Sequence, residues 1–241
     1  MPFPRFALPL AITIGLAIAL PTGAGAAQPA SGTGGLRAVA AAEDDDAPVL
    51  PSRVANALRR TDNALASAES HLDEGEYSQA VTALRSVKNN MYRADRAARA
   101  QMNAAPPADP EGEGDDAVTT GPDSVIAVLG EEHEVVVTLA GLFDTNSKGV
   151  VDGLSHTLFR TISARDGLLN AVIALDPEGA GADYADGMAD TADQYPDEVA
   201  NLTETLASDS LSAGGRAVLT PALTRVTATA NAFAAAFGGG E

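Results

Sequence analysis

The chain has 241 residues, a formal net charge of −18 at pH 7, and neither cysteine nor tryptophan. Its 33 acidic and 15 basic residues argue against nucleic-acid binding, because phosphates are held by clustered cations. Without cysteine there are no disulfides, so the fold must be stabilised by a packed core.

The first segment, residues 1–26, has the pattern of a secretory signal peptide. Arg5 precedes an apolar run over residues 7–20, and the small residues Ala24, Gly25 and Ala26 follow. The alternative is a membrane anchor, but the apolar run is short of the roughly 20 residues that cross a bilayer. We therefore expect cleavage, no membrane span afterwards, and a secreted or envelope-associated protein.

Two acidic stretches without hydrophobic periodicity are predicted to be disordered. The first covers residues 27–50 and contains the acidic run from Glu43 to Asp46. The second, residues 104–121, combines prolines, glycines and acids without a single base. These stretches bound a first folded region, residues 51–103.

Apolar residues recur in steps of three and four across residues 51–103, which predicts a helical hairpin with coiled-coil-like packing. The residues are Val54, Leu58, Thr61, Leu65, Ala68 and Leu72, then Tyr77, Val81, Leu84, Val87, Met91, Ala94, Ala98 and Met102. Ser52 is the expected N-cap, and Gly75 is expected to end the first helix. The turn EGEYSQA is similar to the middle of a tetratricopeptide repeat. A single copy is visible, and repeats need about three, so a peptide-binding array is not expected.

The region 122–238 shows further helical periodicity. Pro122 suits the start of a helix that continues to Phe143, although strands 124–129 and 134–139 are an alternative. A helix from Val151 to Val172, an acidic segment that Pro196 either kinks or divides, and a last helix capped by Ser212 follow. The fold class predicted for the whole chain is an all-α helical bundle of about five to six amphipathic helices.

The charge is divided unevenly along the chain. Residues 51–103 contain eight bases and six acids, whereas residues 104–241 contain five bases and 23 acids. Five bases crowd the second helix of the hairpin: Arg85, Lys88, Arg93, Arg96 and Arg99. They form either a solvated face, a face that docks on the acidic half of the protein, or a contact for an anionic envelope component or partner protein.

Residues Asp144–Ser155 resemble the calcium loop of an EF-hand. Asp144, Asn146, Gly149, Val151 and Asp152 agree with the pattern. However, Lys148 occupies a ligand position, and Ser155 replaces the bidentate glutamate. Because calcium affinity depends on the number of carboxylates, a helix connector is the preferred interpretation, and weak cation binding is the alternative.

Other candidate chemistry is sparse. His133-Glu134 begins a zinc-protease motif, but position 137 is valine; neither His71, His133 nor His156 has a glutamate three places before it, as bundle di-iron sites require. No serine-hydrolase elbow or phosphate-binding glycine loop is present. We therefore predict no catalytic, cofactor-binding or metal-binding residues, no cofactor, and no enzymatic activity.

Several stretches together resemble uncharacterised secreted, alanine-rich helical proteins of actinobacteria: the leader, EGEYSQA, LSHTLF, VIALDPEGAGADYADGMADT and the terminal FGGGE. The resemblance implies export and a helical fold, and it implies no activity. The leading hypothesis is an exported, non-enzymatic helical bundle that contacts an envelope component or a partner protein. The alternatives are cation binding by Asp144–Ser155 or by the acidic tract from Asp176 to Glu198, and an enzyme that uses scattered acids and His156. The acids of this tract, among them Asp193, Asp197 and Glu198, are expected on a solvated surface.

Overall fold

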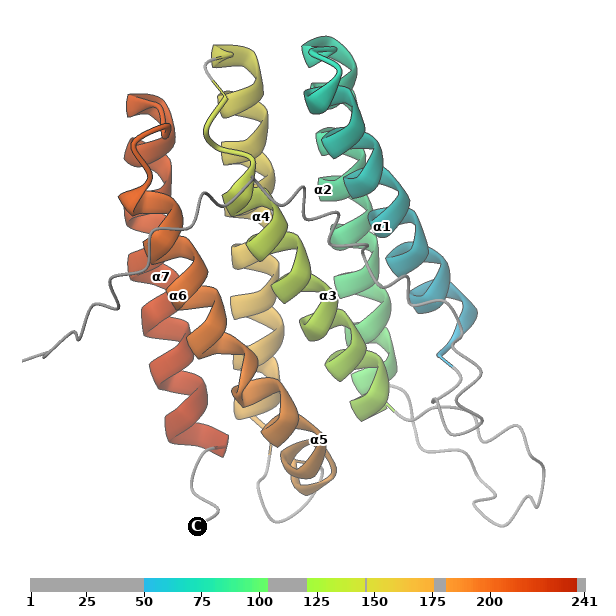
Figure 1. Ribbon diagram of the computed structural model, residues 1–241. Helices are drawn as coiled ribbons and strands as arrows, with labels where there is room; N and C mark the ends of the chain where they lie inside the picture. The colour runs from blue at the N-terminus through green and yellow to red at the C-terminus, as the bar shows by residue number, and fades with distance from the viewer. Residues whose placement is uncertain (1–49, 104–120, 146, 176–180, 238–241) are drawn as a thin grey trace, which may run out of the picture. The chain divides into compact units, whose positions relative to one another are not determined.

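The computed structural model describes residues 50–103, 121–145, 147–175 and 181–237, which form seven α-helices and no strand (Figure 1). The helices are α1 (Ser52–Asp73), α2 (Tyr77–Met102), α3 (Gly121–Gly141), α4 (Lys148–Ile173), α5 (Ala182–Ala192), α6 (Gln194–Ala207) and α7 (Ala213–Phe237). The all-α prediction is confirmed. The alternative of two strands is wrong, since α3 runs without interruption through both of the proposed strand segments. The predicted signal peptide, most of the acidic tail and most of the acidic linker lie outside the described residues.

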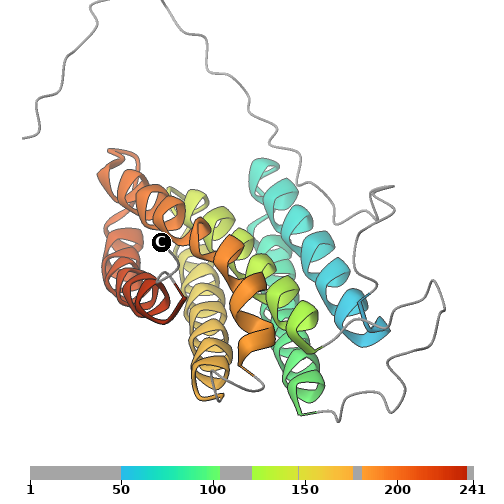
Figure 2. The same ribbon diagram turned by 90° about the horizontal axis from the view of Figure 1, so that it is seen from below.

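The helices pair into three antiparallel hairpins that lie side by side in two layers (Figures 1 and 2). One layer contains α1, α3 and the α5–α6 pair; the other contains α2, α4 and α7. Helix α3 contacts α1, α2, α4, α5 and α6, so it is central to the arrangement. All seven helices belong to one compact unit.

One hydrophobic core joins the predicted hairpin region to the helices that follow it. The same cluster contains Val54 and Met91 from the hairpin, Leu129 from α3, Leu158 from α4 and Phe233 from α7. The apolar face of the first hairpin, which a lone hairpin leaves exposed, is therefore covered by α3 and α4.

The sequence signals at the helix ends are partly correct. Gly75 has φ of +73° and ends α1 as predicted, and Ser212 accepts a hydrogen bond from the Gly215 amide at 3.0 Å. Ser52 is wrong as the N-cap, because it is the first helical residue and Pro51 occupies the cap position. Tyr77, predicted to face the core, is 48% exposed.

The acidic segment after α4 forms two short helices. Asp193 separates α5 from α6, and Pro196 lies in the first turn of α6, where its missing amide hydrogen costs no intrahelical bond. Of the two alternatives for Pro196, the start of a new helix is therefore the one observed.

Candidate functional site

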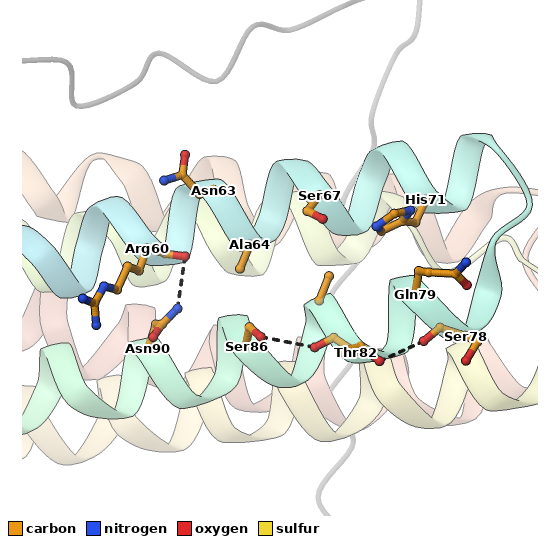
Figure 3. Close-up of a pocket in the computed structure, with 11 residues that line it drawn as sticks. Arg60, Asn63, Ala64, Ser67, His71, Ser78, Gln79, Thr82, Ser86 and Asn90 are labelled. Carbon is orange, nitrogen blue, oxygen red and sulfur yellow. Dashed lines mark hydrogen bonds between the residues drawn. The ribbon is translucent and has the colours of Figure 1, made fainter.

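A groove runs along the outward face of the first hairpin, between α1 and α2 (Figure 3). One part has a volume of about 550 Å³. Its lining contains Arg60, His71 and two alanines, together with side chains that have amide or hydroxyl groups: Asn63, Ser67, Ser78, Gln79, Thr82, Ser86 and Asn90. The Asn90 amide donates to the Arg60 carbonyl at 3.1 Å and joins the two helices. Among the residues that the structure describes, no carboxylate lines this part of the groove.

The groove continues toward the open end of the hairpin, where four arginines gather. This second part has a volume of about 490 Å³, and its arginines are Arg53 and Arg60 from α1 and Arg93 and Arg96 from α2. All four are exposed. Within the described part of the chain, none of them forms an ion pair with a carboxylate. We call the whole feature, from Arg53 to His71, the hairpin groove.

Arg99 does not share the hairpin groove with Arg93 and Arg96, although the three residues follow one another at steps of three. Its Nε donates to Asp95 Oδ1 at 2.9 Å, and its guanidinium lies over Gly167 of α4. Arg99 and Asp95 line a second groove of about 520 Å³ between α2 and α4. The remaining lining residues of this α2–α4 groove include Lys88, Asn89, Tyr92, Arg160 and Ser163.

A cluster of ionisable side chains lies inside the helical array. Arg165 of α4 donates through one nitrogen to both carboxylate oxygens of Glu198 in α6, at 2.8 and 2.6 Å. His133 Nδ1 of α3 lies 3.0 Å from Glu198 Oε2. Both Arg165 and Glu198 are 0% exposed, and the Arg165 guanidinium stands 5.0 Å from the centroid of the Tyr195 ring. This buried ion cluster links α3, α4 and α6.

Glu132 of α3 lies close enough to this cluster to interact electrostatically with Arg165. It is completely buried, and neither carboxyl oxygen has a hydrogen-bond partner among the described residues. Within the same residues, Nε and one terminal nitrogen of Arg165 also have no partner. Burial raises the pKa of Glu132 well above its ordinary value, and this effect exceeds the opposing attraction of Arg165. This rise favours the neutral form of Glu132, which avoids an unpaired internal charge.

A second buried acid, Glu131, directly precedes Glu132 in α3. Burial, together with a hydrogen bond to Asp62 of α1 and the charge of that carboxylate, raises the pKa of Glu131 to about 9. The Glu131 proton thus bridges two carboxyl groups across the α1–α3 interface. Because Arg165 and Glu198 are sealed from solvent, we interpret the Arg165–Glu198 and Glu131–Asp62 pairs as structural contacts between helices.

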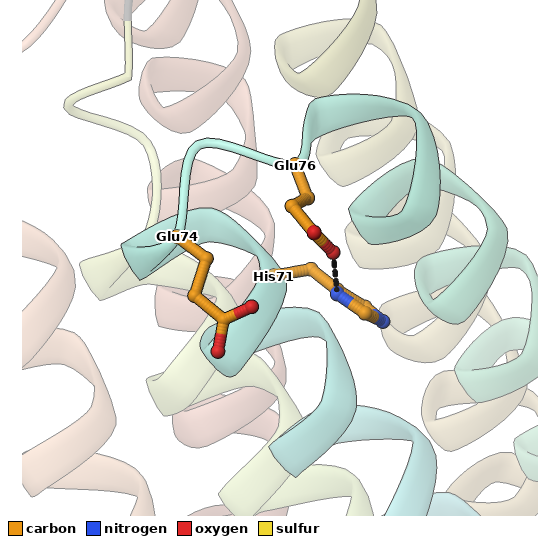
Figure 4. Close-up of side chains that lie close together, drawn as sticks. All are labelled: His71, Glu74 and Glu76. Carbon is orange, nitrogen blue, oxygen red and sulfur yellow. Dashed lines mark hydrogen bonds and ion pairs between the residues drawn. The ribbon is translucent and has the colours of Figure 1, made fainter.

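One group of side chains has a composition suited to a metal ion (Figure 4). His71, Glu74 and Glu76 at the α1–α2 turn offer ligand atoms that all lie within 4.8 Å of one another. His71 Nδ1 is 2.8 Å from Glu76 Oε2, so a hydrogen bond by itself accounts for the position of these two side chains. Glu74 is exposed, and the group lies next to the end of the hairpin groove that His71 lines.

The loop that resembles a calcium site does not have the backbone of a twelve-residue loop. Helix α4 begins at Lys148, so the positions from Lys148 to Ser155 lie on regular helix. The Ser155 hydroxyl donates to the Val151 carbonyl at 2.6 Å, and Asp144 and Asp152 are exposed. Asn146 lies outside the described residues. This geometry favours the helix-connector interpretation.

His133 and His156 differ in solvent exposure, and so do the acids of the acidic tract. His133 is mostly buried against Glu198, as expected for a histidine at a helix interface, whereas His156 is exposed. Asp193 and Asp197 are exposed, but Glu198, which the sequence grouped with them as surface acids, is buried and paired. That grouping is therefore wrong for Glu198.

The buried ion cluster was not predicted from the sequence, although the hydrophobic periodicity contained a signal for it. The apolar steps of α4 jump by seven from Ile162 to Leu169, and Arg165 occupies the missing intermediate position. In the same way, Glu132 lies three residues after Leu129 and four before Val136. A charged residue in the register of a buried stripe is the pattern that would have identified both side chains.

No helix in the described ranges combines the length and apolar character that crossing a membrane requires. The similarity to secreted alanine-rich proteins of actinobacteria stays a prediction. Comparisons of the chain with known protein families, with curated proteins and with solved structures found no match.

Proposed function

We propose that this chain is an exported, non-enzymatic protein that binds an anionic component of the cell envelope through the hairpin groove. The observation that carries the proposal is the set of four exposed arginines, Arg53, Arg60, Arg93 and Arg96, without ion-pair partners among the described residues. They are concentrated in one groove of a chain whose net charge is −18. Arginine presents a planar set of donors that matches carboxylates and phosphates, so an anionic ligand suits this surface.

The groove also has the extent that a polymer or an extended partner requires. Its two parts share Arg60, and together they follow the hairpin from Arg53 to His71. Cations at one end attract an anion over distances of about a Debye length, roughly 8 Å at physiological salt. The amides and hydroxyls beyond them provide directional hydrogen bonds along the ligand.

The proposal predicts that the double variant Arg93→Gln/Arg96→Gln binds isolated envelopes at least about tenfold more weakly than the natural chain, since two charged contacts are lost. The matched control is Arg59→Gln/Arg85→Gln. It removes the same charge from exposed positions of the same two helices, outside the hairpin groove. Co-sedimentation at several salt concentrations is the measurement. Equal weakening by both double variants would indicate a net-charge effect and would contradict a specific groove.

Divalent-cation binding is the second candidate function, and the positions of His71, Glu74 and Glu76 favour these residues over Asp144–Ser155 as its site. An imidazole with two carboxylates suits zinc better than calcium. In titration calorimetry of the full chain, we expect Glu76→Gln to weaken zinc binding at least about tenfold. The control Asp144→Asn/Asp152→Asn should leave zinc binding unchanged. Calcium binding that disappears in this control variant would instead assign the site to the loop.

A further inference from the structure

We infer that the anionic ligand of the hairpin groove is an acidic polysaccharide rather than an acidic protein; this inference rests on the proposed function and deepens it. Tyr92 of α2 is 60% exposed. A tyrosine ring in solvent between cations has no role in the core. A flat apolar face beside charged donors suits a ligand that carries both rings and anions.

Cations flank Tyr92 along its own helix. Lys88 and Arg96 lie four residues before and after it, and residues four apart are neighbours on a helix surface. Arg96 lines the hairpin groove, whereas Lys88 and Tyr92 line the α2–α4 groove. Tyr92 therefore stands on the ridge between the two grooves, and a ligand that leaves one groove for the other passes over its ring.

The α2–α4 groove extends the cationic path. Lys88 and Arg160 have no carboxylate partner among the described residues. Asp95, the acid in the lining, is already engaged by Arg99 at 2.9 Å. A Cβ atom at Gly167 would stand 2.7 Å from a terminal nitrogen of Arg99, so glycine provides the space in which the guanidinium lies against α4. The groove thus keeps a net positive charge and a fixed arginine at its floor.

Neutral hydrogen-bonding groups point to the same class of ligand. Asn63, Ser67 and Gln79 line the hairpin groove, and their side chains make no hydrogen bond with another described residue. Amides and hydroxyls of this kind match sugar hydroxyls, which both donate and accept. Aromatic faces supply the apolar contact for a ring, and an acidic peptide chain has no repeating ring to place there. Carboxylated or phosphorylated sugar polymers share this combination of rings, hydroxyls and anions.

The test compares two polyanions of similar length, polygalacturonate and poly-L-glutamate, by titration calorimetry with the full chain. We expect polygalacturonate to bind at least about tenfold more tightly, since ring stacking and hydroxyl contacts are added to charge. Tyr92→Ala should reduce this preference to about twofold or less, and Tyr92→Phe should preserve it. The control Tyr77→Ala removes another exposed tyrosine from α2, one outside both grooves, and should leave the preference intact.

The outcomes separate this inference from the proposed function. Equal affinity for the two polymers, or a preference that survives Tyr92→Ala, overturns the polysaccharide inference and leaves the anion-binding function standing. Tighter binding of poly-L-glutamate would favour an acidic protein as the partner. If neither polymer binds, and phosphorylated dextran does not bind either, the anion-binding function fails as well. Circular dichroism of each variant checks that the helices are retained.

Discussion

Replacing Arg165 with methionine is expected to lower the free energy of unfolding by about 3–5 kcal/mol, because the completely buried Glu198 then loses its main cationic partner. Breaking one half of a buried ion pair leaves an uncompensated charge in a medium that solvates it poorly. The remaining contact, His133 Nδ1 at 3.0 Å from Glu198 Oε2, replaces the two hydrogen bonds from Arg165 only in part. Urea unfolding followed by circular dichroism is the measurement.

Two further variants test whether the effect of Arg165→Met comes from breaking a buried ion pair. Arg225→Met removes a partly exposed arginine that pairs with Asp166 at 2.5 Å, and it should cost about 1 kcal/mol or less because water screens that pair. The double variant Arg165→Met/Glu198→Gln should recover part of the loss, since no charge then stays unpaired. If Arg165→Met cost no more than Arg225→Met, the buried ion cluster would not stabilise the fold as described.

The stability of the protein is expected to fall as the pH rises from 5 to 9. Glu131 and Glu132 both have pKa values raised by burial, that of Glu131 to about 9, whereas the same groups ionise near 4.5 in the unfolded chain. The folded state therefore holds more protons above pH 4.5, and each group lowers the free energy of unfolding by up to about 1.4 kcal/mol for every pH unit between its unfolded and its folded pKa. Their favourable contribution is fully present below pH 4.5 and is lost as the pH rises through the folded value.

Glu131→Gln should flatten this pH dependence and increase stability at pH 8. Its amide stays neutral and can donate to the Asp62 carboxylate without taking up a proton, so the contact between α1 and α3 is kept. The control Glu204→Gln makes the same substitution at an exposed position of α6 and should leave the slope unchanged. Urea unfolding at pH 5, 6, 7 and 8 measures both. A slope that is the same in Glu131→Gln and the natural chain would rule out the buried carboxyl as its source.

The hairpin groove and the buried ion cluster lie on different helices, so ligand binding and stability can be tested separately. The arginines of the groove are exposed and lie on α1 and α2, whereas the buried ion cluster lies on α3, α4 and α6. Variants in the groove are therefore expected to change ligand affinity with little effect on unfolding. Variants in the cluster are expected to do the reverse.

The sequence by itself determined that the chain folds into helices and, along α1, which face is buried. In α1 the predicted residues from Val54 to Ala68 are buried, since steps of three and four place apolar side chains on one side of a helix wherever the partner lies. The positive φ of Gly75 was likewise predictable, because the turn requires a backbone conformation that glycine adopts without steric cost. The crowding of arginines on α2 was visible, although its division between two grooves was not.

The tertiary structure decided which polar side chains share a site. Arg93 and Arg99 lie on one helix at steps of three, but α1 flanks the first and α4 the second, so only the packing distinguishes their surroundings. The pairing of Arg165 with Glu198 joins residues 33 positions apart, and no local pattern encodes that distance. Local periodicity follows from the geometry of a single helix, whereas sites follow from the order in which helices pack. That order depends on the summed contacts of all seven helices in the described part of the chain.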